Sequence, residues 1–370
     1  MSQPILFQPL TLRGLTLPNR IGVAPMCQYS AHDGQAQDWH FQHYGALAAS
    51  GPGMVTIEAT GIVPEGRISA YCLGLYDDAS EAALTRLVSS LKALSSGAVA
   101  LQLAHAGRKA AAARSWEGGG PASDGWPTLS ASDLPFGPDW PAPKAATPGD
   151  LDGVKQGFVE AARRALRAGF DAIELHSAHG YLLHQFLSPL TNRRTDCYGG
   201  SLDNRMRFPL EVVAALRKAW PADKPLGIRI SATDWVEGGW DIDEAVIYAQ
   251  AFRDAGVDYV CVSTGGLAPH AKVPVGPGYQ LPFARRIRAE TDLVTRAVGL
   301  IATGTDAEAA LQAGDADLIA IGRGFLDDPR WAWHAAETLG VEIPTPPQYA
   351  AARPRVWPGA ALTRPGKTPK

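Results

Sequence analysis

The sequence AGFDA at residues 168–172 joins the end of an amphipathic segment to the start of a short apolar run. Similar junctions follow at 255–258 (AGVD) and 313–317 (AGDAD), and a looser one lies at 96–98 (SGA). A glycine that ends a helix, followed by an acidic or apolar step into a strand, is typical of repeated βα units. The recurrence therefore predicts a fold built from such units around a parallel sheet.

The whole chain alternates short apolar runs with longer amphipathic segments. The expected strands are 20–24, 54–59, 98–103, 172–175, 226–230, 259–263, 295–298 and 318–321, and the expected helices include 80–95, 151–168, 205–219, 243–255, 306–313 and 329–339. Asp328-Pro329 offers the last helix an N-cap with proline at its first position. Eight units fit a closed barrel better than a doubly wound open sheet, which uses the same units. We therefore predict an α/β fold, a single (β/α)8 TIM barrel over residues 1–345.

Two segments depart from this alternation. Residues 105–148 are rich in Gly, Pro, Ser and Trp, and a loop of this length after the third strand is expected to lie over the barrel mouth and to be functional. The tail at 346–370 is rich in proline and carries Arg353, Arg355 and Trp357. We expect this tail to contact a neighbouring subunit, with a disordered terminus as the alternative.

Composition excludes several classes of protein. Hydrophobic residues make up 46% and charged residues 19%, and the net charge of -3 gives no basic excess for nucleic acid. Residues 1–9 carry no leader pattern, and no apolar run approaches the roughly 18 residues of a membrane span, so we expect a cytoplasmic protein. The four cysteines are far apart, which argues against a disulfide framework or a cysteine-rich metal site. Motifs of Rossmann, P-loop, α/β-hydrolase and zincin proteins are missing.

Polar or special residues recur at the carboxyl ends of the expected strands, the face on which barrel enzymes place their active sites. They are Cys27, Tyr29, Gln102, His176, Arg229 and Arg323. Taken singly, each would be more simply explained by packing or a salt bridge. Their shared position is what indicates a site.

The segment HSAHGY at 176–181 is the most informative of these. His176 and His179 could be zinc ligands, but no carboxylate or cysteine stands at a suitable spacing. As neutral donors they could instead polarise a carbonyl or nitro oxygen, and Tyr181, with an ordinary pKa of about 10, could deliver a proton. Packed or solvated histidines are the third possibility.

A phosphate site is indicated after the last two strands. Gly322-Arg323-Gly324 follows the eighth strand, and the glycines at 299–304 follow the seventh. Barrels build phosphate sites from these two loops, where glycine lets backbone N–H groups approach and arginine binds two oxygens at once. A phosphate-bearing ligand is therefore expected.

With these residues in view, the chain resembles the Old Yellow Enzyme family, in particular its compact bacterial ene-reductases and xenobiotic reductases. The resemblance rests on PMCQYS (25–30), QLAHAGRK (102–109), ELHSAHGY (174–181), FLSPL (186–190), NRRTD (192–196), YGGS (198–201), NR (204–205) and IGR (321–323). These segments stand in the family's order between about residues 4 and 349. The extra iron–sulfur domains of the related dienoyl-CoA reductases are missing, and the alanine- and proline-rich tail after Gln348-Tyr349 departs from the family pattern.

The resemblance implies an FMN across the barrel mouth, reduced by NAD(P)H and reoxidised by an enone or nitro substrate. Its phosphate would meet Gly322 and Arg323, and the residues around its ring would be Ala24, Pro25, Met26, Cys27, Ala59, Gln102 and Arg229. The resemblance assigns the substrate oxygen to His176 and His179. Hydride would come from flavin N5, and Tyr181 would protonate the substrate.

In the same comparison, Tyr29 would be a second substrate donor and Cys27 a tuner of the flavin. A homo-oligomer, dimer or tetramer, is expected. Two other functions remain open: a metal-dependent barrel hydrolase or lyase that uses His176 and His179 as ligands, and a flavin-binding protein without turnover.

Overall fold

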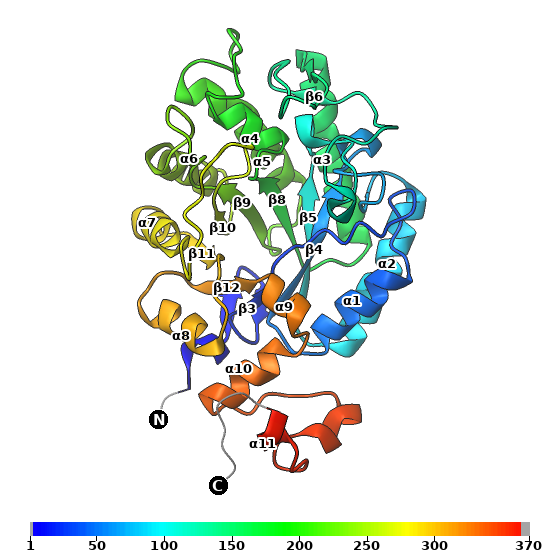
Figure 1. Ribbon diagram of the computed structural model, residues 1–370, viewed down its shortest axis with the longest axis vertical. Helices are drawn as coiled ribbons and strands as arrows, with labels where there is room; N and C mark the ends of the chain where they lie inside the picture. The colour runs from blue at the N-terminus through cyan, green and yellow to red at the C-terminus, as the bar shows by residue number, and fades with distance from the viewer. Residues whose placement is uncertain (1–2, 364–370) are drawn as a thin grey trace.

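The computed structural model describes residues 3–363, and its core is a closed barrel of eight parallel strands (Figure 1). Around the barrel these strands follow chain order, and the last pairs with the first. They are β3 (Ile21–Val23), β4 (Met54–Gly61), β5 (Ala98–Ala104), β8 (Ala172–Ser177), β9 (Leu226–Ser231), β10 (Tyr259–Ser263), β11 (Val294–Ala297) and β12 (Leu318–Ile321). The predicted TIM barrel is confirmed, and each expected strand overlaps an observed one.

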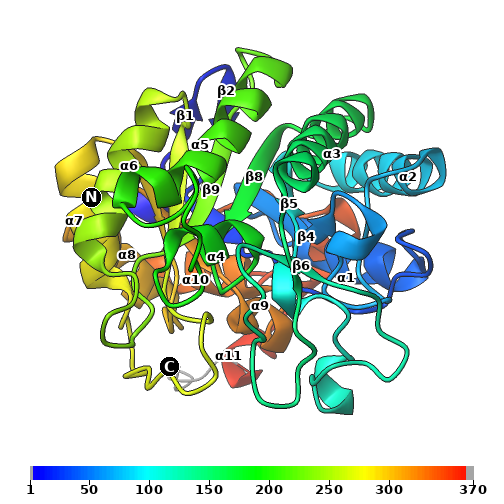
Figure 2. The same ribbon diagram turned by 90° about the horizontal axis from the view of Figure 1, so that it is seen from above.

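Helices surround the strands, as the view from above shows (Figure 2). Their bounds are α1 (Asp38–Ala48), α2 (Asp78–Leu94), α3 (Pro148–Arg167), α4 (Leu182–Leu187), α5 (Leu202–Ala219), α6 (Ile242–Asp254), α7 (Leu281–Thr291), α8 (Gly304–Gln312), α9 (Arg323–Asp327), α10 (Trp331–Leu339) and α11 (Ala360–Thr363). Gly169 has φ +90° beyond the end of α3, as the AGFDA junction predicted. The expected N-cap at Asp328-Pro329 is wrong, because the Asp328 carboxylate accepts from Arg330 N in a turn and α10 begins at Trp331 with Arg330 as its N-cap.

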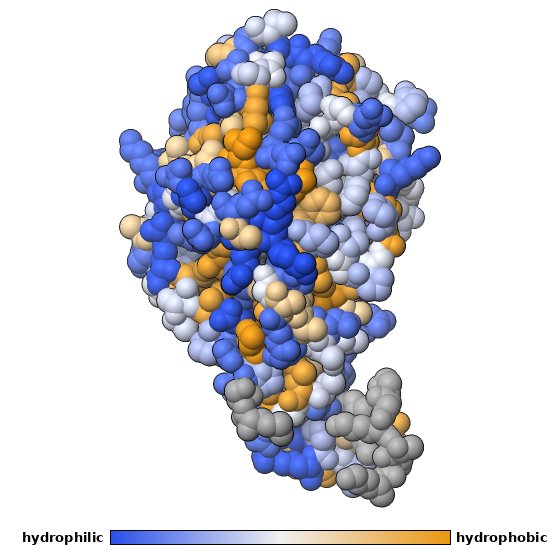
Figure 3. All heavy atoms as spheres, turned by 90° about the vertical axis from the view of Figure 1, so that its left-hand side faces the viewer, coloured by the Kyte–Doolittle hydropathy of each residue, from blue (hydrophilic) through white to orange (hydrophobic). Residues whose placement is uncertain are grey.

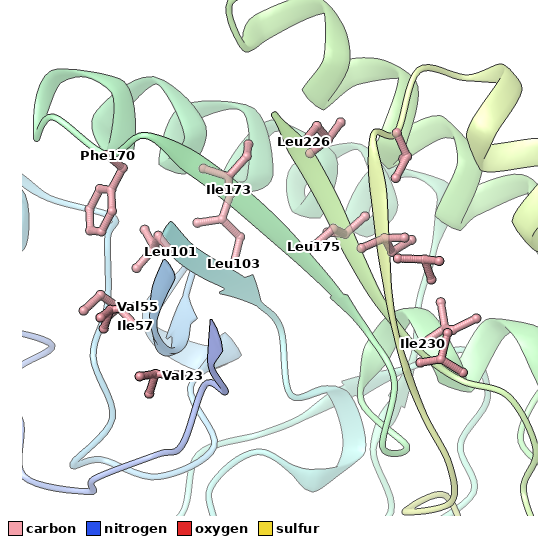
Figure 4. Close-up of a cluster of buried hydrophobic side chains, with 14 of the residues drawn as sticks. Val23, Val55, Ile57, Leu101, Leu103, Phe170, Ile173, Leu175, Leu226 and Ile230 are labelled. Atoms are coloured by element: carbon pink, nitrogen blue, oxygen red, sulfur yellow. The ribbon is translucent and has the colours of Figure 1, made fainter. Parts of the chain in front are cut away.

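The core lies between the barrel and its helices. Figure 4 shows buried side chains from β3, β4, β5, β8 and β9 gathered in one cluster. A hairpin of β1 (Leu10–Leu12) and β2 (Leu15–Leu17) packs Leu12 and Leu17 against residues at the amino-terminal starts of the strands. This packing closes one end of the barrel and leaves the carboxyl ends for a site.

The segment at 105–148 contains only short elements. They are the 3-10 turns η3 (Gly107–Lys109) and η4 (Ser115–Glu117) and the strand pair β6 (Leu129–Ser130) and β7 (Lys144–Ala145). After α10, the chain forms the 3-10 helix η5 (Pro347–Ala352) and α11 at the lower end of the molecule in Figure 1. The face of the molecule in Figure 3 is mostly hydrophilic, with scattered apolar residues. Within residues 3–363, no helix is long and apolar enough to span a membrane.

Candidate active site

A cavity of about 620 Å³ lies at the carboxyl ends of the barrel strands. Its walls come from the ends of β3, β9, β10, β11 and β12 and from the loops that follow β11 and β12. Several predicted site residues line it together: Ala24, Pro25, Met26, His179, Arg229, Gly322 and Arg323. The fold therefore brings most of the expected cofactor-binding residues to one hollow.

The two histidines stand side by side at the end of β8. The ring centroids of His176 and His179 are 5.2 Å apart and the rings are nearly perpendicular, at 84°. His176 Nδ1 accepts a hydrogen bond from Ala178 N at 3.3 Å, which places the proton of a neutral ring on Nε2. His179 Nε2 lies 2.8 Å from the hydroxyl of Ser263, which lines the cavity. Both rings are thus held by neighbours and each keeps a second nitrogen for a ligand.

Both histidines are electrically neutral at ordinary pH. Burial, and then the positive charge of Arg229, lowers the pKa of His176 well below its usual value. The same two causes lower the pKa of His179. Neutral rings can donate N–H bonds to an oxygen without adding charge to the site.

Tyr181 completes this group. Its ring lies edge-on to His176 with centroids 4.9 Å apart, and the Lys109 ammonium lies 5.0 Å from the Tyr181 ring centroid. Lys109 Nζ donates to the carbonyl oxygens of His179 and Gly266, both at 2.9 Å. These two bonds hold the Lys109 ammonium against the turn that carries His179 and Tyr181. Burial raises the pKa of Tyr181 well above 10, and the negative charge that nearby Cys27 would carry as a thiolate raises it further. The phenol therefore keeps its proton.

Cys27, Tyr29 and Ala59 are not among the residues that line the cavity, but they lie close to Tyr181. All three pack in one small apolar cluster, which Tyr181 also contacts. Tyr29 has a left-handed backbone (φ +49°) and its ring meets Trp116 of η4 edge-on at 5.8 Å. The long loop at 105–148 therefore reaches the site, as its position in the sequence suggested.

Arg229 is an uncompensated cation. It projects from β9 beside His176, with which it is paired in register, and it lines the cavity. Its Nε is buried without a hydrogen-bond partner, and none of the ion pairs within residues 3–363 includes it. A half-buried cation whose Nε is buried without a partner calls for an anionic or electron-rich ligand.

Gln102 belongs to a polar network within the barrel. It is buried inside the barrel, where its Nε2 donates to Glu174 at 2.8 Å, and Glu174 pairs in turn with Arg296 of β11. Arg296 was not among the site residues predicted from the sequence. The sequence alone does not tell whether an arginine in a strand points into the barrel or lies at the barrel mouth. This network uses one N–H of the Gln102 amide and leaves its carbonyl oxygen and second N–H uncommitted.

The other end of the cavity has the features of a phosphate site. Gly322 and Arg323 line it at the start of α9, beside Gly299 at the end of β11. Gly299 has φ +108°, a conformation that requires glycine. Gly304 instead packs on Ala335 of α10, so only the first part of the expected 299–304 segment reaches the cavity.

A metal centre receives no support from the side chains described. No group of three or more His, Cys, Asp or Glu among residues 3–363 is arranged to hold an ion. The polar lining of the cavity includes the neutral ring of His179, the phenol of Tyr279, the carboxylates of Asp327 and Asp328, and two arginines, Arg229 and Arg323. The two guanidinium groups suit an organic ligand with an anionic edge.

Comparison with known proteins agrees with this geometry. Residues 5–342 match the model of the NADH:flavin oxidoreductase / NADH oxidase family. The NADPH dehydrogenase of Geobacillus thermodenitrificans (strain NG80-2) is 46% identical over 347 residues, covering 93% of this chain and 97% of that protein. The NADPH dehydrogenase of Bacillus subtilis (strain 168) is 43% identical over 351 residues, covering 93% and 98%. A structure of morphinone reductase in complex with tetrahydroNAD superposes with a TM-score of 0.75 at 31% identity, covering 93% of each chain.

The fold and the site thus define a flavin-binding barrel oxidoreductase. The chain belongs to the NADH:flavin oxidoreductase family, the Old Yellow Enzyme family, and the resemblance found in the sequence is confirmed. It is an NAD(P)H-dependent flavin oxidoreductase.

Proposed function

We propose that the protein is an FMN-dependent ene-reductase that reduces the activated C=C bond of enones and related electron-poor substrates. The observation that carries this proposal is a cavity lined by His179 and the unpaired Arg229, with the neutral ring of His176 packed against His179 and the protonated Tyr181 packed against His176. A container for flavin would need no proton donor aimed at the same space.

FMN fits the residues present. Gly322 and Arg323 would hold the phosphate, and Arg229 would meet the electron-rich edge of the ring. The remaining walls would be Ala24, Pro25, Met26, Cys27, Ala59 and Gln102, whose amide keeps its carbonyl oxygen and one N–H beside the bond to Glu174. When bound, FMN supplies hydride transfer between NAD(P)H and the substrate.

The protein's own side chains would bind and activate the substrate. His176 and His179 would donate N–H bonds to its carbonyl or nitro oxygen and polarise the conjugated C=C bond. Tyr181 would then give its phenolic proton to the carbon next to the activating group. Tyr29 would be a further donor, and Cys27 would tune the flavin from the wall rather than attack the substrate.

The tail is proposed to serve a neighbouring subunit. In the tail, Tyr349 packs edge-on against Trp333 of α10 with ring centroids 5.6 Å apart, and Val356 and Trp357 are exposed. A homo-oligomer would place such residues near another copy's cavity, with Arg353, Arg355 or Trp357 as the anchor. We further propose that the protein works in the cytoplasm.

The direct test is the cofactor itself. The purified protein should be yellow, and heat should release FMN in about one equivalent per chain. Mixed with NAD(P)H and an enone, it should form the saturated ketone. A colourless protein that takes up no FMN on reconstitution would refute the proposal.

A further inference from the structure

The turn that carries His179 and Tyr181 has a strained backbone. His179 is left-handed (φ +57°), and Gly180 follows with φ +71°. A left-handed backbone is costly for a residue with a side chain and persists only where neighbours fix it. The turn packs closely on the loop after β10, because a Cβ on Gly180 would lie 2.4 Å from the carbonyl oxygen of Gly266. The position of both site residues therefore depends on this contact between two backbones.

Lys109, from the 3-10 turn η3 after β5, joins these two segments. Its Nζ donates to the carbonyl oxygens of His179 and Gly266, both at 2.9 Å. One ammonium group thus bonds to both backbones at the place where they meet. Hydrogen bonds from a charged donor are stronger than those from a neutral one. Lys109 therefore holds the turn against the loop.

The loop after β10 is itself anchored at this point. Ser231 Oγ donates to the carbonyl oxygen of Gly265 at 2.8 Å, and the Arg108 guanidinium donates to that of Leu267 at 2.9 Å. These two carbonyls flank the one that accepts from Lys109, so three successive carbonyls of the loop are bonded to side chains. The loop segment is therefore a fixed support to which Lys109 ties the turn.

The same ammonium lies against the proposed proton donor. Lys109 Nζ is 5.0 Å from the ring centroid of Tyr181 and 4.6 Å from that of Phe136. Aromatic faces attract a cation at such distances, so both rings favour this position of the ammonium. Burial, and then the positive charge of Arg108, lowers the pKa of Lys109 to about 8, so most molecules carry the ammonium at pH 7.

We propose that Lys109 is a positioning residue that holds Tyr181 in place to give its proton to the substrate. The inference rests on the proposed function in taking Tyr181 as the proton donor. Lys109 acts through the turn, because its bonds to the two backbones keep the phenol at one position beside His176. Proton transfer is sensitive to such placement, since donor and acceptor must approach to about 3 Å.

Half-reaction kinetics of the flavin-loaded protein test the proposal. Lys109→Met keeps the apolar stem of the side chain and removes the ammonium. We expect reoxidation of the flavin by an enone to slow by about 10- to 10²-fold, while the limiting rate of its reduction by NAD(P)H stays within about twofold. Lys144→Met is the matched control, since Lys144 belongs to the same long loop but is exposed and pairs with Asp150. This control should leave both rates unchanged.

A double-mutant cycle with Tyr181→Phe separates positioning from general damage to the fold. Without a phenolic proton to misplace, Lys109→Met should slow reoxidation by no more than about threefold in the Tyr181→Phe background. A residue that only supports the fold would slow reoxidation by the same factor in both backgrounds. The difference between the two factors therefore measures how far Lys109 acts through Tyr181.

Hydrogen–deuterium exchange gives a second reading that needs no flavin. The amides of Gly180 and Tyr181 and those of the loop at 264–268 would be followed by mass spectrometry of their peptides. In Lys109→Met these amides should exchange about tenfold faster, because two charge-assisted hydrogen bonds between the segments are lost. Lys144→Met should leave the exchange rates unchanged.

Three results would each overturn the proposal: equal slowing by Lys109→Met in both backgrounds, equal slowing of both half-reactions, or unchanged exchange in the turn. If Lys109→Met does not fold, Lys109→Gln, which is also uncharged and is shorter, takes its place in the same cycle. A protein that binds no flavin would refute the proposed function, while the exchange rates would still decide whether Lys109 holds the turn.

Discussion

Replacing Tyr181 with phenylalanine removes one proton donor and little else. The ring contacts with His176 at 4.9 Å and Lys109 at 5.0 Å are made by the aromatic face and edge, which phenylalanine retains. The backbone of residue 181 still precedes α4 and accepts from Gln185 N. We therefore expect the unfolding free energy to change by less than about 1 kcal/mol.

The kinetic effect should be large and confined to one half-reaction. Burial raises the pKa of Tyr181 well above 10, so its proton is available at any working pH. A positioned general acid contributes about 10²- to 10⁴-fold, or roughly 3 to 5 kcal/mol of barrier. Reoxidation of the flavin by an enone should slow by that factor, while its reduction by NAD(P)H, which needs no proton from Tyr181, should stay within about twofold.

Anaerobic stopped-flow measurement of the flavin absorbance separates the two half-reactions. Tyr248→Phe is the control, because Tyr248 is a buried phenol that bonds to Ser177 of β8 at 3.2 Å and, unlike Tyr181, does not pack against His176. This control should leave both rates unchanged. Equal slowing of both half-reactions in Tyr181→Phe, or no slowing of reoxidation, would refute the role given to Tyr181.

Four further predictions follow from the site and its surroundings. His176→Ala should weaken the binding of phenols and enones about tenfold in a spectral titration, because their oxygen loses one donor. Cys27→Ala should keep activity and shift the flavin potential by tens of millivolts, where about 30 mV equals roughly 1.4 kcal/mol; inactivation with flavin still bound would instead indicate a covalent role. Burial lowers the pKa of His105 to about 4, so the unfolding free energy in urea should fall between pH 6.5 and 4, by up to about 1.4 kcal/mol per pH unit, as the unfolded chain takes up the proton first. Deletion of residues 350–370 should raise the KM for the enone and weaken self-association while FMN stays bound; unchanged kinetics and subunit number would exclude a role for the tail.

The barrel was predictable because its signals are local and repeated. Strands such as Tyr259–Ser263 are continuous apolar runs buried on both faces, and glycine stops such as Gly169 mark the junctions between units. The helix α1 was not among the expected elements, since Gly45 and several polar residues blur its periodicity. The start of α10 was misplaced because the Asp328 side chain caps a turn instead of the helix.

The site residues were found from the sequence where they lie near or just beyond the carboxyl end of a strand. His176 and Arg229 lie in the carboxyl-terminal halves of β8 and β9, and His179, Tyr181 and Arg323 follow β8 and β12. Residues whose importance depends on contacts between distant segments could not be found in this way. Lys109 meets Gly266 of the loop after β10, and Arg296 pairs with Glu174 across 122 positions, so only the folded chain brings them together.

The central claim is that one cavity binds FMN and passes reducing equivalents from NAD(P)H to an activated C=C bond. An anaerobic titration of the purified protein with NAD(P)H, followed by an enone, tests it most directly. The account predicts that about one equivalent of NAD(P)H bleaches the flavin absorbance and that one equivalent of enone restores it with formation of the saturated ketone. A flavin that is bleached but is not reoxidised by any enone, while dioxygen reoxidises it readily, would contradict the account.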